Sequence, residues 1–570
     1  MTTGVAREQT ATVVARSSRL WPHVLALLLA LTSLTPVIGL DAPFSADEGA
    51  VLAQADALVS GDGWLAEHPF PEADPELEWY PLDRASRVGD RFAAYAKLPL
   101  YAAIVAGLYA LGGMAAVVGL SIVSTVAAAW GAAAIARRLE PVLAVPVLWV
   151  VGLGSPLLFD AYLVMAHALA AGCVAVAAVS LLRWYEQRAA SWLPLAGVGV
   201  VVAVGTRQEA LLLAMAASAV LGWRWLRGRS TFDLLAVATV VGAAVLGFLA
   251  TRLWVRAILG AANVTVPAAG SAGGGIAGRI PGLTRTWFGF SGESLLFVAL
   301  VLVVGAAVAA RAARTWRLAP LLASAAALLS CVDAVTGGAT LVTGLLVAFP
   351  VLAAGLVTLR REDFTGLSGT LLSITGLFSV AVIATQYERG GTGEWGGRYF
   401  AIGLVLVVPV ALRALWRALR EMPVDLRRIT LGALVVCTIS VSMAAVTALR
   451  GSHQRAVDLT RGVVSVAART SSGDGGLPVV ISTERLMPRL SWRELDEGRW
   501  LLIERDELAL ALNRVGSLGV RAVTVATYLP EGEEPVTVEG WEVAETVRPV
   551  AGYPWSVIVY QRSQEQTFDG

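Results

Sequence analysis

The sequence predicts an all-α polytopic membrane protein of about 13 transmembrane helices, followed by a small extracytoplasmic α/β domain at the C-terminal end. Of the 570 residues, 56% are hydrophobic and only 15% are charged, and the mean hydropathy is +0.67. A soluble fold of this length does not need so much apolar surface. A second observation is a series of apolar runs, each near the roughly 20 residues that cross a bilayer. The third is a change of composition after residue 450, where short strand-like runs replace the long apolar ones.

The predicted spans follow one another closely. They fall at 20–40, 114–135, 141–159, 162–182, 190–206, 209–226, 233–253, 294–311, 318–335, 339–358, 366–386, 399–417 and 429–449. The stretch 98–113 is apolar but only sixteen residues long, so we expect an interfacial or partly inserted helix there.

Arginine clusters set the predicted orientation. They occur at Arg7/Arg16/Arg19, Arg137/Arg138, Arg183/Arg188, Arg224/Arg227/Arg229, Arg311/Arg314/Arg317, Arg360/Arg361 and Arg417/Arg420/Arg427/Arg428. All of them share one side of the membrane, which the positive-inside rule identifies as the cytoplasm. We therefore expect residues 1–19 to form a cytoplasmic tail and 20–450 a transmembrane domain with a large outer loop at 41–113. Residues 451–570 then form the extracytoplasmic domain, with strands near 479–481, 500–503, 522–526 and 556–560 and a helix at 506–518.

Composition also excludes several functions. A net charge of +1 provides no basic face for a nucleic acid, so no nucleic-acid partner is expected. The three cysteines, Cys173, Cys331 and Cys437, lie inside apolar runs without the spacing of a disulfide framework or a zinc site.

Two neighbouring carboxylates, Asp47 and Glu48, follow the first predicted span. A carboxylate at the mouth of a membrane cavity can act as a general base on an acceptor hydroxyl. The alternative is an ordinary solvated loop that happens to carry two charges. Two further outer loops, at about 254–293 and 388–399, are rich in glycine and carry arginines.

These residues resemble motifs of the GT-C superfamily of membrane glycosyltransferases. The resemblance rests on Asp47-Glu48-Gly49 after span one and on Lys97-Leu98-Pro99-Leu100-Tyr101, where Leu98 replaces one proline of the usual Lys-Pro-Pro-Leu. Further similarity lies in Met165–Ala168, Thr206–Glu209 and Trp395–Tyr399. Aminoarabinose, protein O-mannosyl and arabinofuranosyl transferases are relatives by this pattern, of an actinobacterial type.

The resemblance implies an inverting transfer of a sugar from a polyprenyl-phosphate donor to a glycan, lipid or protein acceptor on the extracytoplasmic face. Asp47 is then the expected catalytic base and Glu48 its support. Guanidinium groups bind phosphate oxygens through paired hydrogen bonds, so outer cations are expected to hold the donor phosphate. These cations are Lys97, Arg398, Arg207, Arg279 and Arg285.

Four further residues are expected to bind substrate: His167, Glu209, Trp395 and Tyr399. Each has a simpler alternative. Arg207 and Glu209 can form a salt-bridged helix turn, His167 can be a packing residue, and the two aromatic residues can belong to an interfacial belt.

The sequence leaves two further questions open. No tight metal-ligand spacing is visible, so no metal ligand is assigned, although acidic residues near the donor could hold Mg²⁺ or Mn²⁺. The alternative function is a transporter or flippase of an anionic lipid-linked substrate. Against it, the sequence shows no internal repeat and no matched pair of interrupted spans.

Overall fold

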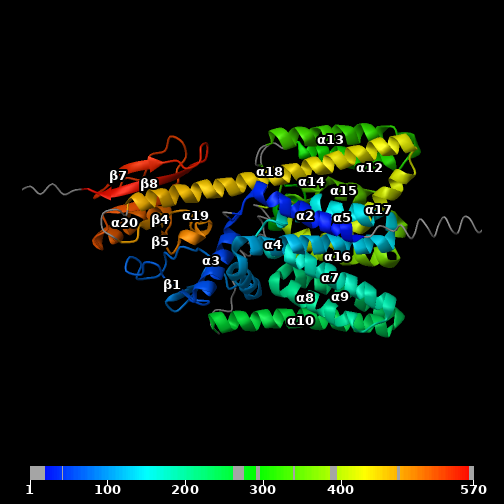
Figure 1. The fold of residues 1–570 in the computed structure, drawn as a ribbon, viewed down its shortest axis with the longest axis horizontal. Coiled ribbons are helices and arrows are strands. Elements are labelled where there is room, and N and C mark those ends of the chain that lie inside the picture. The colour runs from blue at the N-terminus through cyan, green and yellow to red at the C-terminus, as the bar shows by residue number, and fades with distance from the viewer. Residues whose placement is uncertain are drawn as a thin grey trace, which may run out of the picture. The chain divides into compact units, whose positions relative to one another are not determined.

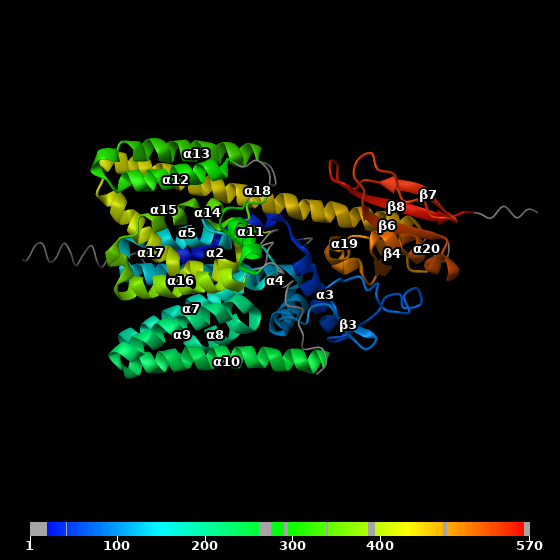
Figure 2. The ribbon, with the colours of Figure 1, turned by 180° about the vertical axis from the view of Figure 1, so that it is seen from behind.

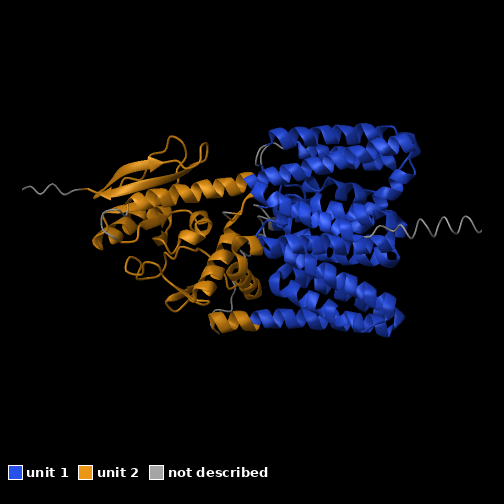
Figure 3. Ribbon diagram, viewed as in Figure 1, with its two compact units in different colours: residues 1–38, 118–252, 267–450 blue, residues 39–117, 253–266, 451–570 orange. Residues whose placement is uncertain are grey.

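The computed structural model describes residues 20–40, 43–260, 275–289, 295–337, 340–385, 394–470 and 476–563. The chain divides into two compact units. Unit 1 comprises residues 1–38, 118–252 and 267–450, and unit 2 comprises 39–117, 253–266 and 451–570 (Figure 3).

Unit 1 is a bundle of helices that run side by side (Figures 1 and 2). Its elements in chain order are α2 (Leu20–Ile38), α4 (Pro99–Leu139, whose first part belongs to unit 2), η1 (Pro141–Leu143), α5 (Ala144–Leu153), α6 (Leu157–Asp160), α7 (Ala166–Gln187), α8 (Trp192–Thr206), α9 (Gln208–Gly228), α10 (Thr231–Leu259, whose last part belongs to unit 2), α11 (Gly275–Phe288), α12 (Leu296–Ala310), η3 (Ala313–Thr315), α13 (Leu318–Thr336), α14 (Leu345–Ala348), α15 (Pro350–Val357), η4 (Arg361–Phe364), α16 (Gly366–Thr385), η5 (Arg398–Phe400), α17 (Ala401–Arg420) and α18 (Val424–Thr470, whose last part belongs to unit 2). Most residues of α17 are buried, so this helix lies at the core of the bundle.

The helical membrane class is confirmed. Nine of the described helices are long and apolar enough to cross a membrane. Three shorter apolar helices, 141–153, 192–206 and 296–310, occupy three more of the predicted spans. The remaining span, at 339–358, contains α14 and α15, which are separated at Phe349 because Pro350 cannot continue a helix that precedes it.

Glycine and proline also account for other departures from the predicted spans. The predicted span 141–159 ends early, because Gly154, Ser155 and Pro156 separate α5 from α6. Helix α4 is kinked at Gly112 and Gly113, where Gly113 has a φ of 59°. The predicted interfacial helix 98–113 therefore corresponds to the first part of α4, before the kink.

Unit 2 contains a five-stranded sheet with the order β5-β4-β6-β8-β7. Its strands are β4 (Val479–Ser482), β5 (Arg499–Leu502), β6 (Ala522–Tyr528), β7 (Trp541–Val547) and β8 (Trp555–Arg562). Strand β4 pairs in parallel with β5 and β6, whereas β8 is antiparallel to β6 and β7. The helical elements are α19 (Leu486–Leu490), η6 (Trp492–Glu494), η7 (Arg505–Glu507) and α20 (Leu508–Ser517). The predicted C-terminal α/β fold is thus confirmed, with β7 as an additional edge strand.

The described part of the predicted outer loop, residues 43–113, belongs to the same unit as this sheet. It forms α3 (Ala46–Ser60) and a small sheet of β1 (Ala66–Glu67), β2 (Ser86–Val88) and β3 (Arg91–Ala93). Phe70 and Trp79 lie in the hydrophobic core around α20. The Leu502 N–H donates a hydrogen bond of 2.9 Å to the Trp79 carbonyl. The loop and the C-terminal segment therefore fold together.

Candidate active site

A buried cluster of ionisable side chains lies in unit 1. Asp160 ends the short helix α6, His167 is in the first turn of α7, and Glu394 precedes η5. The Nδ1 atom of His167 is 3.9 Å from Asp160 Oδ1 and 3.7 Å from Glu394 Oε2. All three side chains are at most 2% exposed. Three ionisable groups so deep in an apolar bundle are costly unless they are compensated, which identifies this cluster as a functional site candidate.

Two arginines border the cluster. Arg398 Nη1 donates to Glu394 Oε1, and Arg398 Nη2 donates to the Tyr399 hydroxyl over 3.2 Å. Arg207 Nη2 donates to Glu209 Oε1 over 2.7 Å. The charges of both guanidinium groups act on Asp160. Since only 13–14% of each arginine side chain is exposed, their positive charge is concentrated where little water screens it.

Several polar atoms of the cluster lack a hydrogen-bond partner among the described residues. They are Oδ2 of Asp160 and both ring nitrogens of His167. A buried polar atom without a partner costs free energy, and a bound ligand or ion is one physical reason for keeping it. The unsatisfied atoms therefore point to something that binds here.

The cluster has the donor atoms of a metal site. Asp160, His167 and Glu394 each offer one ligand atom, and these atoms lie within 4.8 Å of one another. Two carboxylate oxygens and one imidazole nitrogen are a donor set that divalent cations accept. The residues present therefore fit a divalent cation.

The segment that carries Glu394 and Arg398 is held by its two glycines. Gly396 and Gly397 have φ values of 71° and 66°, a region that favours glycine. A Cβ on Gly396 would lie 2.3 Å from Pro156 Cγ, so the backbone passes close to α6. The N–H groups of Gly396 and Gly397 donate to the carbonyls of Val342 and Thr343 over 2.8 and 2.7 Å. The fixed backbone sets the position of the charged side chains on either side.

The other predicted residues of unit 1 take varied positions. Trp395 is buried, and its ring stacks on Phe159 with a centroid distance of 6.1 Å. Arg279 Nη1 donates to the Ala384 carbonyl. Arg285 lies on α11 with an exposed side chain. Glu209 is paired with Arg207, as the alternative interpretation of a salt-bridged turn expects.

The predicted catalytic pair lies in unit 2, at the start of α3. Glu48 is 1% exposed, and its Oε2 accepts a hydrogen bond of 2.8 Å from the Ser45 N–H, which closes a capping box. The Asp47 side chain is 38% exposed, and its Oδ1 lies 3.8 Å from both Arg84 Nη1 and Arg489 Nη1. Glu48 therefore fixes the helix start, whereas Asp47 remains accessible between two cations.

Two further features shape this part of unit 2. Gly49 packs against the backbone of Arg489, where a Cβ would lie 1.8 Å from the Arg489 carbonyl oxygen. Arg489 is 5% exposed and also pairs with Asp83, so burial lowers its pKa although Asp83 and Asp47 oppose this effect. Lys97 is exposed, two residues before α4 begins.

The sequence alone did not identify Asp160 or Glu394 as site residues. Glu394 lies within the glycine-rich outer loop at 388–399, only four residues before Arg398. Asp160 follows a predicted span and precedes His167 by one short loop, so its signal was an acidic residue between two apolar runs. Neither signal shows by itself that the two carboxylates meet at His167.

No protein-family model matches the chain, and no curated protein matches it. Among solved structures, ArnT from Cupriavidus metallidurans in the apo state is similar with 13% identity and a TM-score of 0.48, over 97% of this chain and 98% of that chain. The structure of the same protein bound to undecaprenyl phosphate has 14% identity and a TM-score of 0.49, over 96% of this chain and 98% of that chain. The Archaeoglobus fulgidus oligosaccharyltransferase in complex with zinc and sulfate has 13% identity and a TM-score of 0.46, over 88% of this chain and 67% of that chain. Because the identities and TM-scores are low, these similarities carry no argument about the reaction or its residues.

Proposed function

We propose that the protein is an integral-membrane glycosyltransferase of the GT-C type. It moves a sugar, hexose or pentose, from a polyprenyl-phosphate donor to a glycan, lipid or protein of the cell envelope. The observation that carries the proposal is the buried cluster of Asp160, His167 and Glu394 bordered by Arg207 and Arg398. The two arginines provide positive charge for an anionic ligand, and the cluster has polar atoms left to bind it. Because the surrounding unit is apolar and helical, such a ligand can reach the site from a lipid bilayer.

The arginines supply the chemistry that such a donor needs. When the bond between the anomeric carbon and the phosphate oxygen breaks, negative charge develops on the departing polyprenyl phosphate. A fixed guanidinium group stabilises that charge through paired hydrogen bonds. Arg398 is held by Glu394 and Tyr399, and Arg207 by Glu209, so both are preorganised for this role. Among the other predicted cations, Lys97 and Arg285 have exposed side chains, and we propose that they also contribute to donor binding.

The proposal includes a divalent cation on Asp160, His167 and Glu394. The histidine nitrogen beside two carboxylate oxygens suits Mn²⁺ better than Mg²⁺, which prefers oxygen ligands. A cation held there would supply further positive charge for the phosphate oxygens. The three side chains would keep the cation in place, and Arg398 would hold Glu394 in position through its hydrogen bond.

The acceptor needs a base, for which we propose Asp47. Its carboxylate takes the proton of the acceptor hydroxyl as the hydroxyl oxygen bonds to the anomeric carbon. The bond to the phosphate breaks on the opposite side, which inverts the anomeric configuration. Arg84 Nη1 and Arg489 Nη1 each lie 3.8 Å from Asp47 Oδ1, so two cations flank the proposed base. Glu48 is the proposed positioning residue, because its capping box fixes the start of α3.

The proposed location is the plasma membrane, with the N-terminus cytoplasmic and the C-terminal domain extracytoplasmic. At one end of unit 1, arginines link neighbouring helical segments through ion pairs. Arg138 pairs with Glu186, and Arg417 pairs with Asp363. The positive-inside rule makes this end cytoplasmic. His167 lies at the opposite end of α7 from Glu186, about 28 Å away at 1.5 Å per residue. That length is close to the roughly 30 Å of a bilayer core, so the cluster faces the extracytoplasmic side.

The test is release of polyprenyl phosphate from a panel of polyprenyl-phosphate hexoses and pentoses, with full-length protein in proteoliposomes and cell-envelope extract as acceptor. The wild type should release polyprenyl phosphate from at least one donor. Arg398→Gln should reduce the rate by about 100-fold or more, the effect of removing one preorganised donor to a developing anion. Arg413→Gln is the matched control, because Arg413 lies further along the chain, on α17, and donates to Ser368. Movement of the intact lipid-linked sugar across the membrane without cleavage would instead support the flippase.

A further inference from the structure

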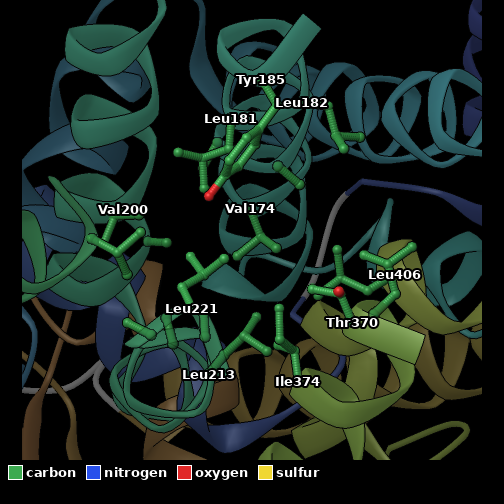
Figure 4. A pocket seen from close by; sticks show the side chains of 18 of the residues that line it. Val174, Leu181, Leu182, Tyr185, Val200, Leu213, Leu221, Thr370, Ile374 and Leu406 are labelled. Carbon is green, nitrogen blue, oxygen red and sulfur yellow. The ribbon is translucent and has the colours of Figure 1, made fainter. Parts of the chain in front are cut away.

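A cavity in unit 1, away from the Asp160 cluster, has an almost entirely apolar lining. It lies between α7, α8, α9, α16 and neighbouring helices, and it encloses about 880 Å³ of space between side chains, including the part open to the surroundings. Its lining consists of alanine, valine, leucine and isoleucine, with three exceptions: Tyr185, Arg224 and Thr370. Figure 4 shows Val174, Leu213 and other aliphatic side chains around the cavity. Such a surface fits a hydrocarbon chain.

The three polar lining residues gather at one end of the cavity. Tyr185 is close to the end of α7, Arg224 is close to the end of α9, and Thr370 is in the first turns of α16. Arg224 Nη1 donates to Thr370 Oγ1 over 3.3 Å, and the Arg224 guanidinium carbon is 5.4 Å from the centre of the Tyr185 ring. The lining at the other end includes Ala203 and Ala210. The cavity therefore has one polar end and one apolar end.

The cavity is at least as long as one leaflet of a bilayer core is thick. Ala210 and Arg224 both line it and lie fourteen residues apart on α9. At 1.5 Å per residue they are separated by about 21 Å along the helix. Half of a bilayer core is about 15 Å thick. One acyl chain can therefore extend along α9 with its head group beside Arg224.

The surroundings of the polar end are basic and aromatic. Four arginines there stack on rings, in the pairs Arg183 on Trp192, Arg188 on Phe232, Arg227 on Trp223 and Arg229 on Trp225. The acidic groups near this end include Glu186, which pairs with Arg138, Asp363, which pairs with Arg417, and Asp233, whose Oδ1 is 3.5 Å from Arg224 Nη2. Arginines thus outnumber acids at this end. Basic residues beside tryptophan and tyrosine are typical of a membrane interface that attracts anionic head groups.

We propose that this cavity is a binding site for an anionic phospholipid of the cytoplasmic leaflet. One acyl chain fills the apolar cavity, and the phosphate binds Arg224, whose side chain is 43% exposed despite its contact with Asp233. The site is separate from the proposed transfer of sugar, because Arg224 and His167 lie at opposite ends of unit 1. A polyprenyl chain entering from the Asp160 cluster would place its phosphate at the other end.

The experiment is native mass spectrometry of the full-length protein after incubation with equal amounts of phosphatidylglycerol and phosphatidylcholine of identical chains. Two variants probe the site. Arg224→Gln removes the charge, and Ala217→Phe fills the cavity. Each has a control on α9: Arg227→Gln removes a neighbouring charge, and Met215→Phe adds the same ring at a position that is 60% exposed.

The wild type should retain one phospholipid and prefer phosphatidylglycerol by about fivefold, the attraction of one arginine for a net anionic head group. Phosphatidylcholine has the same phosphate, but its choline cation cancels the charge. Arg224→Gln should still retain a lipid but lose the preference, Ala217→Phe should lose both lipids, and the controls should behave like the wild type. Ala217→Leu, a smaller change, should reduce retention even if Ala217→Phe fails to fold. Equal retention of the two lipids by the wild type would overturn the proposal. The proposal would also be overturned if the protein retained a polyprenyl phosphate in place of the phospholipid and the Arg224→Gln variant retained it equally well.

Discussion

His167 Nδ1 lies 3.7 Å from Glu394 Oε2, although one residue begins α7 and the other precedes η5, far along the chain. Both side chains are almost completely buried, and neither ring nitrogen of His167 has a hydrogen-bond partner within the described part of the chain. A divalent cation would satisfy both groups at once. We therefore expect the purified protein to bind such a cation through His167.

His167→Gln should weaken Mn²⁺ binding by at least about tenfold, because loss of a direct ligand costs no less than loss of its supporting groups. The measurement is the amount of free Mn²⁺, by electron paramagnetic resonance, in titrations of the purified protein. His23→Gln is the control, because His23 lies on α2 and accepts a hydrogen bond from Trp149 of α5, and neither helix carries a residue of the cluster. If both variants bind Mn²⁺ as the wild type does, the cation is not held by His167.

Substitutions of the neighbouring residues Asp47 and Glu48 should have different effects, one on the rate of catalysis and the other on the stability of the fold. Asp47→Asn should reduce kcat by about 10²- to 10⁴-fold, the contribution of a general base, with little change in thermal unfolding. Glu48→Gln should instead lower the stability by about 0.5–2 kcal/mol, because it weakens the cap of α3. Asp56→Asn, on the same helix, is the control for charge. Normal turnover by Asp47→Asn would remove that residue from the mechanism.

Gly49→Ala should destabilise unit 2. The added Cβ would lie 1.8 Å from the Arg489 carbonyl oxygen, which belongs to the backbone and cannot rotate away. Overpacking typically costs about 1–3 kcal/mol, and a backbone contact falls at the upper end of that range. Gly107→Ala is the matched control on α4, because nothing lies within 4 Å of the position that its new methyl group would take. Unfolding curves of the two variants should therefore shift in opposite directions or by clearly different amounts.

Unit 2 should lose stability in acid through Asp74. Burial by itself raises the pKa of Asp74, but His68 and the N–H groups of Trp79 and Glu78 lower it below its ordinary value of 3.8. A lowered folded-state pKa means that Asp74 contributes stability above pH 3.8, and this contribution is lost as the pH falls through the folded-state pKa. The His68 Nε2 atom is 3.1 Å from Asp74 Oδ2.

The measurement for Asp74 is thermal unfolding of the full-length protein between about pH 3 and pH 7. Asp74→Asn should be less stable at neutral pH and should show a smaller loss of stability in acid. Asp90→Asn, an exposed carboxylate of the same unit, should follow the wild type. An acid-induced loss of equal size in Asp74→Asn would show that other carboxylates cause it.

Local sequence signals predicted much of the fold, because hydrophobic length and arginine placement are properties of short segments. The positions of the membrane helices and of four strands of unit 2 follow from them. Strand β7 was not predicted, because most of Trp541–Val547 is exposed and its alternation of apolar residues is interrupted by a bulge between Val543 and Glu545. The breaks at Pro156 and Pro350 shorten predicted spans that hydropathy alone makes continuous.

Contacts between distant segments were harder to predict. Nothing in the sequence around Trp79 indicates that its carbonyl accepts a hydrogen bond from Leu502. For the same reason His167 and Arg398 were predicted individually, whereas Asp160 and Glu394 were not selected. Their role depends on a meeting of α6, α7 and the segment before η5, which only the packing of unit 1 produces.

The most direct test of the central claim is photocrosslinking of the purified protein with a polyprenyl phosphate that carries a diazirine beside the phosphate, mapped by mass spectrometry. If the cluster holds the donor phosphate, crosslinks should concentrate in residues 157–167 and 394–400, and Arg398→Gln should reduce them. Crosslinks confined to the cavity end at Arg224 or to the C-terminal sheet, and unchanged by Arg398→Gln, would contradict the proposal.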